Sequence, residues 1–215
     1  MPLKQIGNKK SLSQRAYEIL KEAIVTGEFL QGQILTEEQL AQELAISRTP
    51  VRSAVKQLEY EGLVEINSSR SIVVAKITEK DIKDAVQARN LVEVEVAGIL
   101  AESASKEQCE ELRKIIQLQK ESFLNHKNID LIEYECLFHT KIGQFCGNIW
   151  FEKLLTNIAL LQKRVLILGG KFENNWEEAI EEHLKITELL ENHDTSGVKE
   201  LMAVHIKNGQ PVLKI

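Results

Sequence analysis

Apolar residues recur at helical spacing through the first third of the chain, and polar turns interrupt them. One stripe runs through Ser11–Thr26, and a second seam runs through Leu40–Leu58. Residues three and four positions apart share one face of a helix. The pattern therefore predicts one helix before Gly27 and a pair of short helices within Thr36–Leu63. The seam of this helix pair consists of Leu40, Ala41, Leu44, Ile46, Val51, Val55 and Leu58.

Capping residues mark the ends of the predicted helix pair. Thr36 followed by Gln39 matches a capping box, in which two side chains satisfy free N–H groups of the first turn. Ser47 is expected to cap the second helix. Pro50 then falls in its first turn, where a missing N–H costs nothing. Gly62 is expected to end this helix.

Two β-rich segments follow the helix pair. Leu63–Ile66 and Ile72–Ala75 flank the polar residues 67–71, which predicts a two-stranded wing. A helix, a helix-turn-helix and a wing make a winged-helix domain, and a helix-turn-helix presents the start of its second helix to the DNA major groove. The alternative, an ordinary helical hairpin within a helical core, is disfavoured by the wing. The residues at the start of the second helix are Ser47, Arg48, Thr49 and Arg52.

Helical periodicity replaces strand-like alternation from Thr78 onward. Six amphipathic helices with short connections are typical of a helical bundle. We therefore predict a mostly α protein with a winged helix-turn-helix domain at 1–77 and an all-helical bundle of about six helices at 78–215. The expected bundle helices are about 79–102, 106–126, 129–146, 148–168, 174–192 and 195–208.

The net charge of −5 is unusual for a DNA-binding protein, but it is unevenly distributed. Residues 1–77 contain ten Lys or Arg and nine Asp or Glu, whereas residues 78–215 contain 17 and 23. A local basic patch matters more for DNA binding than the total charge. We expect the acidic residues of the first part to lie mostly outside the DNA face. The basic residues expected on that face are Arg48, Arg52, Lys56 and Arg70.

Compartment signals favour a cytoplasmic protein. No apolar run approaches the roughly 18 residues of a membrane span. The start, MPLKQIGNKK, has no apolar run behind its basic residues, so it does not indicate a secretion signal. Cys109, Cys136 and Cys146 are odd in number and lack CxxC spacing, which favours reduced thiols.

Three histidines lie on the apolar faces of three different predicted helices. His139, His183 and His205 are therefore expected to point toward the bundle interior. Glu135 precedes His139 by four residues and lies one turn away on the same face. One carboxylate and three imidazoles are suitable ligands for a divalent transition metal of the Zn, Ni or Mn class. Hydrogen-bonded core histidines would produce the same pattern, so both interpretations stay open.

Arg89 is an unusual residue on a face that also carries Ile82 and Val86. Glu93 follows one turn later, so one interpretation is an ion pair at the edge of the bundle. The other is a fork-shaped donor for the carboxylate of an effector. Arg164, late in the fourth bundle helix, is a second candidate for the same effector cavity.

The segment SRTPVRSAVKQLEYEGLV, within a match that extends from Ser11 to Ile66, resembles the GntR family of bacterial transcription regulators. The resemblance implies that Arg48, Thr49 and Arg52 read operator DNA. Many members carry an arginine where this chain has Glu38, and a glycine in the wing tip where this chain has residues 67–71. Arg70 is still expected to reach a minor groove or a phosphate.

The second half resembles the FCD effector domain of FadR-type GntR regulators. The matching pieces are ARNLVEVEVAGILAE, YECLFHTKI, IEEHLKITELLENHD and LMAVHIKN. The resemblance implies a metal ion bound by Glu135, His139, His183 and His205, although the usual acid is Asp or Asn. It also implies a small organic acid effector, held with help from Arg89. The short linker and the six helices suggest the VanR-like group.

These observations predict a ligand-responsive transcription regulator, a repressor that binds a palindromic operator as a homodimer. They do not predict an enzyme, because no separate general base accompanies the histidines. Two alternatives remain: a metal-dependent hydrolase or isomerase that uses the three histidines and the carboxylate, and a DNA-binding regulator whose bundle is a metal-free dimerisation module.

Overall fold

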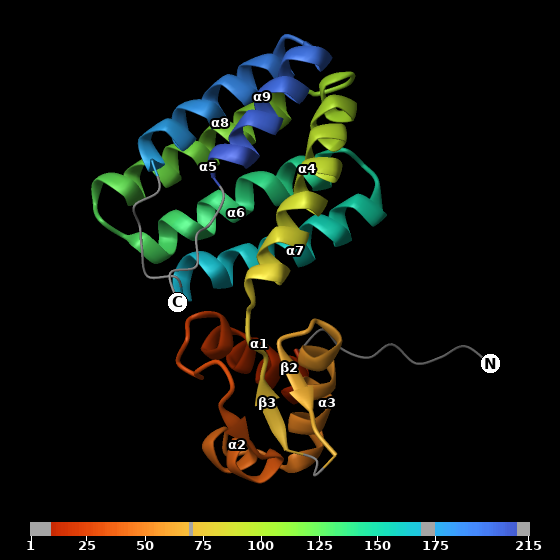
Figure 1. Cartoon of the computed structure of the whole chain (residues 1–215), viewed down its shortest axis with the longest axis vertical. Helices are drawn as coiled ribbons and strands as arrows, with labels where there is room; N and C mark the ends of the chain where they lie inside the picture. Colours follow the sequence, from red (N-terminus) through yellow and green to blue (C-terminus); the bar gives the residue numbers. More distant parts are fainter. Residues whose placement is uncertain (1–9, 69–70, 169–174, 210–215) are drawn as a thin grey trace, which may run out of the picture. The chain divides into compact units, whose positions relative to one another are not determined.

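The computed structural model describes residues 10–68, 71–168 and 175–209, and the chain divides into two compact units, residues 1–76 and 77–215 (Figure 1). The boundary expected from the sequence lies one residue later. Buried apolar side chains are found in both units. Arg70, one of the residues expected to contact DNA, lies outside the described residues.

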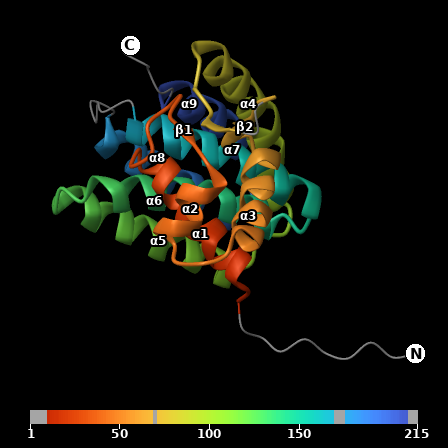
Figure 2. The ribbon, with the colours of Figure 1, turned by 90° about the horizontal axis from the view of Figure 1, so that it is seen from below.

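The described part of the N-terminal unit contains three helices, and the first and second both pack on the third (Figure 2). Thr36 and Gln39 form the expected capping box at the start of the second helix. Ser47 is the N-cap of the third helix, as expected, with the extended backbone of that position, although its hydroxyl makes no capping hydrogen bond. The three helices are α1 (Leu12–Val25), α2 (Glu37–Glu43) and α3 (Arg48–Tyr60).

The apolar seam of the helix pair forms the core of this unit. α1 contributes Leu20 and Ile24 to the same core. The turn between α2 and α3 passes through Ala45, whose φ of 52° lies in the left-handed region that favours glycine. Buried seam residues are Leu40, Ala41, Val51, Val55 and Leu58.

A small antiparallel sheet completes the winged helix. The predicted wing strands are β2 (Val64–Ile66) and β3 (Ile72–Val74), with Val64 opposite Val74. A third strand, β1 (Ile34–Leu35), pairs with the other edge of β3, and the sequence analysis assigned no strand there. Two residues are too few to show a period of two, so this strand carries no pattern of its own.

The C-terminal unit contains six helices in the described residues, as the sequence predicts. Thr78 and Asp81 form a capping box at the first of them. Helices α4 and α9 pack together, α6 packs between α5 and α7, and α8 packs on α5 and α9. The helices are α4 (Glu79–Ala101), α5 (Lys106–Leu124), α6 (Asn128–Phe145), α7 (Ile149–Leu168), α8 (Trp176–Glu191) and α9 (Thr195–Asn208).

The interior of this unit combines aliphatic packing with an unusual number of buried polar side chains. Its main cluster includes Leu112, Phe138 and Met202, each with no exposed surface. Buried charges and imidazoles are costly unless they are paired or bind a metal. The buried polar residues of the unit are Arg89, Glu93, Gln119, Ser122, Glu135, His139, Gln162, Arg164, Glu182, His183, Thr187 and His205.

Candidate nucleic-acid interface and metal centre

The arginines expected to read DNA lie on the exposed side of α3. The side chains of Arg48 and Arg52 are 60% and 56% exposed, and Ser47 and Thr49 are also exposed. This placement leaves their donors accessible to a nucleic acid. Position 38, where many family members carry an arginine, is occupied by Glu38 and supplies no basic side chain.

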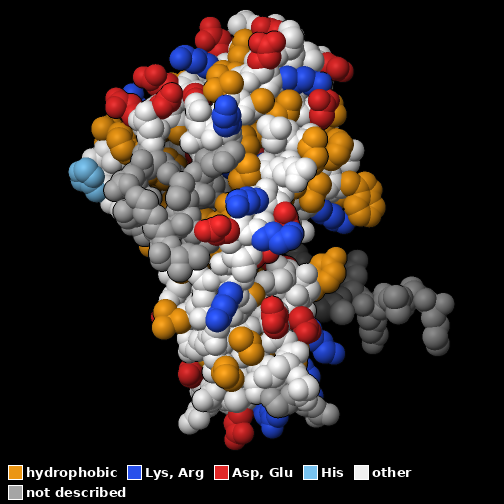
Figure 3. Space-filling model, in the orientation of Figure 1, with side chains coloured by type: hydrophobic (Ala, Val, Ile, Leu, Met, Phe, Trp, Pro, Cys, Tyr) orange, Lys and Arg blue, Asp and Glu red, His pale blue; other side chains and the backbone are white. Residues whose placement is uncertain are grey.

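An acidic residue lies against these arginines, contrary to the expectation that the acids avoid the DNA face. Glu37, at the start of α2, accepts hydrogen bonds from Nε and Nη2 of Arg52 at 2.8 and 2.7 Å. Its Oε2 atom also lies 3.5 Å from Nη2 of Arg48. These bonds lower the pKa of Glu37, chiefly through Arg52. On the face shown in Figure 3, basic and acidic side chains are likewise interspersed.

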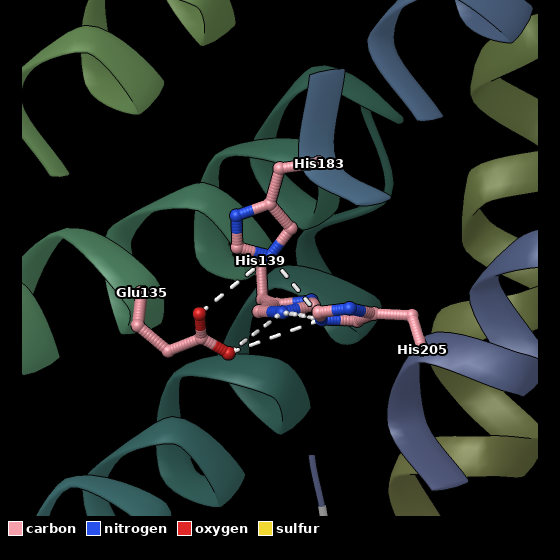
Figure 4. A group of neighbouring side chains, drawn as sticks. All are labelled: Glu135, His139, His183 and His205. Carbon is pink, nitrogen blue, oxygen red and sulfur yellow. Dashed lines mark hydrogen bonds and ion pairs between the residues drawn. The ribbon is translucent and has the colours of Figure 1, made fainter. Parts of the chain in front are cut away.

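Glu135, His139, His183 and His205 converge inside the helical unit. They come from α6, α8 and α9, and one ligand atom from each lies within 4.8 Å of the others (Figure 4). The Nε2 atom of His205 lies 3.1 Å from that of His139 and 3.2 Å from that of His183. The three imidazoles are buried, as expected for histidines that point toward the bundle interior from three helices.

The Nδ1 atom of each imidazole has a polar partner on another helix. His183 Nδ1 lies 2.9 Å from Oε1 of Gln119, whose amide nitrogen donates to Glu135 at 3.0 Å. Nδ1 of His205 lies 2.7 Å from a carboxylate oxygen of Glu182. Nδ1 of His139 lies 2.7 Å from a carboxylate oxygen of Glu93, an ion-pair contact without the geometry of a hydrogen bond.

These partners determine which ring nitrogens carry hydrogen. A carboxylate or amide oxygen only accepts, so Nδ1 of His183 and of His205 is the donor, and in the neutral ring Nε2 is left with a lone pair. Burial also lowers the pKa of His183 well below its usual range, which favours the neutral ring. When all three rings are neutral, their Nε2 lone pairs and the carboxylate of Glu135 face one another, an arrangement that a cation would stabilise.

The spacing of the four groups fits one bound ion. Glu135 oxygens lie 3.4 Å from Nε2 of His139, 3.6 Å from that of His183 and 3.9 Å from that of His205. Ligands bound about 2.1 Å from a metal lie roughly 3.0–3.5 Å apart. The residues present therefore fit a four-ligand divalent metal site, with a slightly long separation between Glu135 and His205.

Arg89 forms an ion pair with Glu93, but not at the edge of the bundle. Nε of Arg89 donates to Glu93 at 2.6 Å, and both side chains are almost fully buried. Burial alone would raise the pKa of Glu93, but the charges of Arg89 and His139 lower it. Arg89 thus belongs to a chain of contacts that ends on the imidazole of His139.

A cavity of about 50 Å³ adjoins the cluster and is lined in part by Glu135 and His205. It is also lined by Gln162 and Trp176, and the indole N–H of Trp176 is buried without a hydrogen-bond partner in the described residues. A bound water needs roughly 10–15 Å³ of such space, so the cavity has room for a few waters or a carboxylate group.

The two arginines proposed for the effector lie elsewhere. In the described part of the chain, neither Arg89 nor Arg164 lines this cavity. Arg89 lines a smaller one of about 10 Å³, which Gln162 also borders. Arg164 is 3% exposed, and burial lowers the pKa of its guanidinium.

Sequence reasoning missed most of the residues that support these sites. Gln119 interrupts the apolar stripe of α5, and such an interruption was the available signal. Glu182 and Glu37 carry no periodic signal, because each contacts a residue of another helix. Gln162 and Trp176 are recognisable only from the cavity that they line.

Comparison with known sequence families matches each of the two units to a family. The profile of bacterial regulatory proteins of the gntR family matches residues 12–74, and the profile of the FCD domain matches residues 84–208. The chain belongs to the GntR family. Its helical unit is an FCD domain, and the regulator therefore has the two-domain fold that the sequence predicts. The narrower VanR-like assignment stays a prediction.

Relatives of the regulator span nearly its whole length. It is 25% identical over 205 residues to the HTH-type transcriptional repressor RspR of Escherichia coli (strain K12), covering 94% of this chain and 89% of that protein. It is 26% identical over 194 residues to the gluconate operon transcriptional repressor of Bacillus subtilis (strain 168), covering 90% and 76%. The regulator is accordingly a DNA-binding transcriptional regulator.

A solved structure has the same fold. The E. coli protein McbR/YncC matches with a TM-score of 0.78 at 18% identity, covering 93% of this chain and 95% of that one. At this identity the likeness concerns the fold alone. Among the described helices, none combines the length and apolarity that crossing a membrane requires.

Proposed function

We propose that the regulator is a cytoplasmic repressor that binds a palindromic operator as a homodimer and responds to a small carboxylate effector at a divalent metal in its FCD domain. The observation that carries this proposal is the convergence of three imidazole lone pairs and one carboxylate beside a cavity. Two of its relatives are transcriptional repressors, which supports repression over activation.

The metal is held by Glu135, His139, His183 and His205 in this proposal. Their Nδ1 partners orient the rings before the ion arrives, which favours binding. Protein purified without a chelator or a histidine tag should contain one divalent ion per chain, and His183→Ala should lose it. A content below about a tenth of an equivalent in the original chain, with no uptake on addition, would rule out the site and favour the metal-free dimerisation module.

The effector binds in the cavity beside the metal in this proposal. Four protein ligands leave a six-coordinate ion of the Ni or Mn class two open positions, and a carboxylate is a suitable ligand for them. The free indole N–H of Trp176 and the amide of Gln162 supply further hydrogen bonds. Arg89 is then a support for His139, and the metal itself is the charge that attracts the acid.

The effector is tested with operator DNA and a panel of hydroxy acids, dicarboxylates and sugar acids. One class should weaken operator binding by the metal-loaded protein, because an effector must prefer one of two states to shift their populations. Trp176→Phe removes the N–H together with one ring of the side chain and should weaken the response. If no acid changes the affinity of the metal-loaded protein, the effector assignment is wrong.

The DNA-binding unit is assigned Arg48, Thr49 and Arg52 as base readers, with Ser47 and Arg70 as further contacts. Two copies of α3 would read half-sites about one helical turn apart. The affinity for the DNA upstream of the gene that encodes this chain should exceed the affinity for bulk DNA at moderate salt. Arg52→Ala should cost about 1–3 kcal/mol of this preference. An unchanged preference would remove Arg52 from the readers.

A further inference from the structure

We propose that Glu37 is a positioning residue for DNA reading, which holds the guanidinium of Arg52 in the orientation that presents its free edge to a base. The inference rests on the proposed role of Arg52 as a base reader. It starts from the finding that the exposed start of α3 is bound by a carboxylate of another helix.

The geometry leaves Arg52 able to bind Glu37 and a base together. A guanidinium has five N–H donors. Glu37 accepts one from Nε and one from Nη2, at 2.8 and 2.7 Å. Three N–H groups remain, two on Nη1 and one on Nη2. One from each nitrogen can donate in parallel to the O6 and N7 atoms of a guanine.

The environment of Glu37 supports a positioning role over simple charge neutralisation. Its side chain is 20% exposed, whereas that of Arg52 is 56% exposed. The carboxylate is therefore the more fixed partner, and it uses both oxygens on one edge of the arginine. Arg48, one turn earlier on α3, lies close to the same carboxylate at 3.5 Å. One acidic side chain thus lies behind two of the proposed readers.

Helix α2 also provides a matched control. Glu38 follows Glu37 in the same first helical turn, so both carboxylates interact favourably with the helix N-terminus. Within the described residues, Glu38 makes no hydrogen bond or ion pair with another side chain. Glu37→Gln and Glu38→Gln therefore remove the same charge from the same turn, and only the first replaces one of the two oxygens that accept from Arg52.

The experiment measures the dissociation constants of the full-length dimer for operator DNA and for a scrambled duplex of equal length. The specificity ratio is the constant for the scrambled duplex divided by the constant for the operator. Glu38→Gln should tighten both by the same factor, because it removes a negative charge near phosphates, and leave their ratio unchanged. Glu37→Gln should lower the ratio by about 5- to 10-fold, a part of the discrimination that one bidentate base contact supplies.

A double-mutant cycle separates positioning from a structural effect. With Arg52→Ala already present, Glu37→Gln should leave the ratio unchanged, because its effect acts through Arg52. An equal effect of the two glutamine substitutions, or a higher ratio for Glu37→Gln, would overturn the proposal. If Arg52→Ala itself leaves the ratio unchanged, the assignment of Arg52 as a reader fails instead.

Discussion

In the described residues, one pattern of paired hydrogen bonds between an arginine and a glutamate, here called a fork, is found both at the surface and in the interior. In the DNA-binding unit, Nε and Nη2 of Arg52 bond the two oxygens of Glu37. In the FCD domain, Nε and Nη2 of Arg89 bond those of Glu93 at 2.6 and 3.3 Å. The two forks differ in burial: Arg52 is 56% exposed, and Arg89 is 4% exposed.

This difference in burial determines what each fork can do. An exposed ion pair contributes little stability, and the free N–H groups of Arg52 face solvent, so Arg52 can bind a DNA base while it keeps its contact with Glu37. A buried pair cannot lose one partner without leaving a charge in the interior. Arg89 and Glu93 are therefore a fixed support, and the acceptor of His139 is held with them. One chemical pair thus serves recognition at the surface and rigidity inside.

The largest expected effect is on the buried fork. Arg89→Met leaves the Glu93 carboxylate buried without its partner, which should destabilise the FCD domain by about 3–5 kcal/mol. Urea unfolding followed by circular dichroism would measure this loss. Lys80→Met, in the exposed ion pair of the same helix with Asp84, is the control and should not change the midpoint. Equal midpoints for the two variants would refute the distinction by burial.

A smaller effect is expected where a carboxylate contacts the proposed metal site. Glu182→Gln weakens the acceptor of His205 Nδ1 and should lower zinc affinity by about 10-fold or more. Competition with a chromophoric chelator measures the affinity. Glu181→Gln changes the exposed neighbour and serves as the control. If both variants bind zinc like the original chain, orientation of the ring by Glu182 contributes nothing to binding.

The smallest expected effect is a gain of stability in the DNA-binding unit. Ala45→Gly relieves a side chain at a φ of 52° and should stabilise the turn between α2 and α3 by up to about 1 kcal/mol. Hydrogen exchange of peptides from α2 and α3 in the full-length protein would detect slower opening. Faster exchange would show that the flexibility added by glycine outweighs the strain removed.

Much of the fold was predictable because its signals are local. Capping at Thr36 and Thr78, and helical spacing throughout the second unit, identified the helices from sequence alone. The convergence of Glu135 with the three histidines was predictable for a related reason, since polar residues on apolar faces stand out. The pairing of Glu37 with Arg52 and of Glu182 with His205 was not predictable, because each joins two helices whose packing no local pattern specifies.

One further consequence follows from the position of Trp176 beside the cavity. Both tryptophans of the chain, Trp150 and Trp176, belong to the FCD domain, and they differ sharply in exposure, at 74% and 5%. Intrinsic fluorescence excited at the red edge of indole absorption therefore reports on this domain and not on the winged helix. A change in emission on adding operator DNA would be an optical signature of communication between the two halves, obtained without attaching a dye.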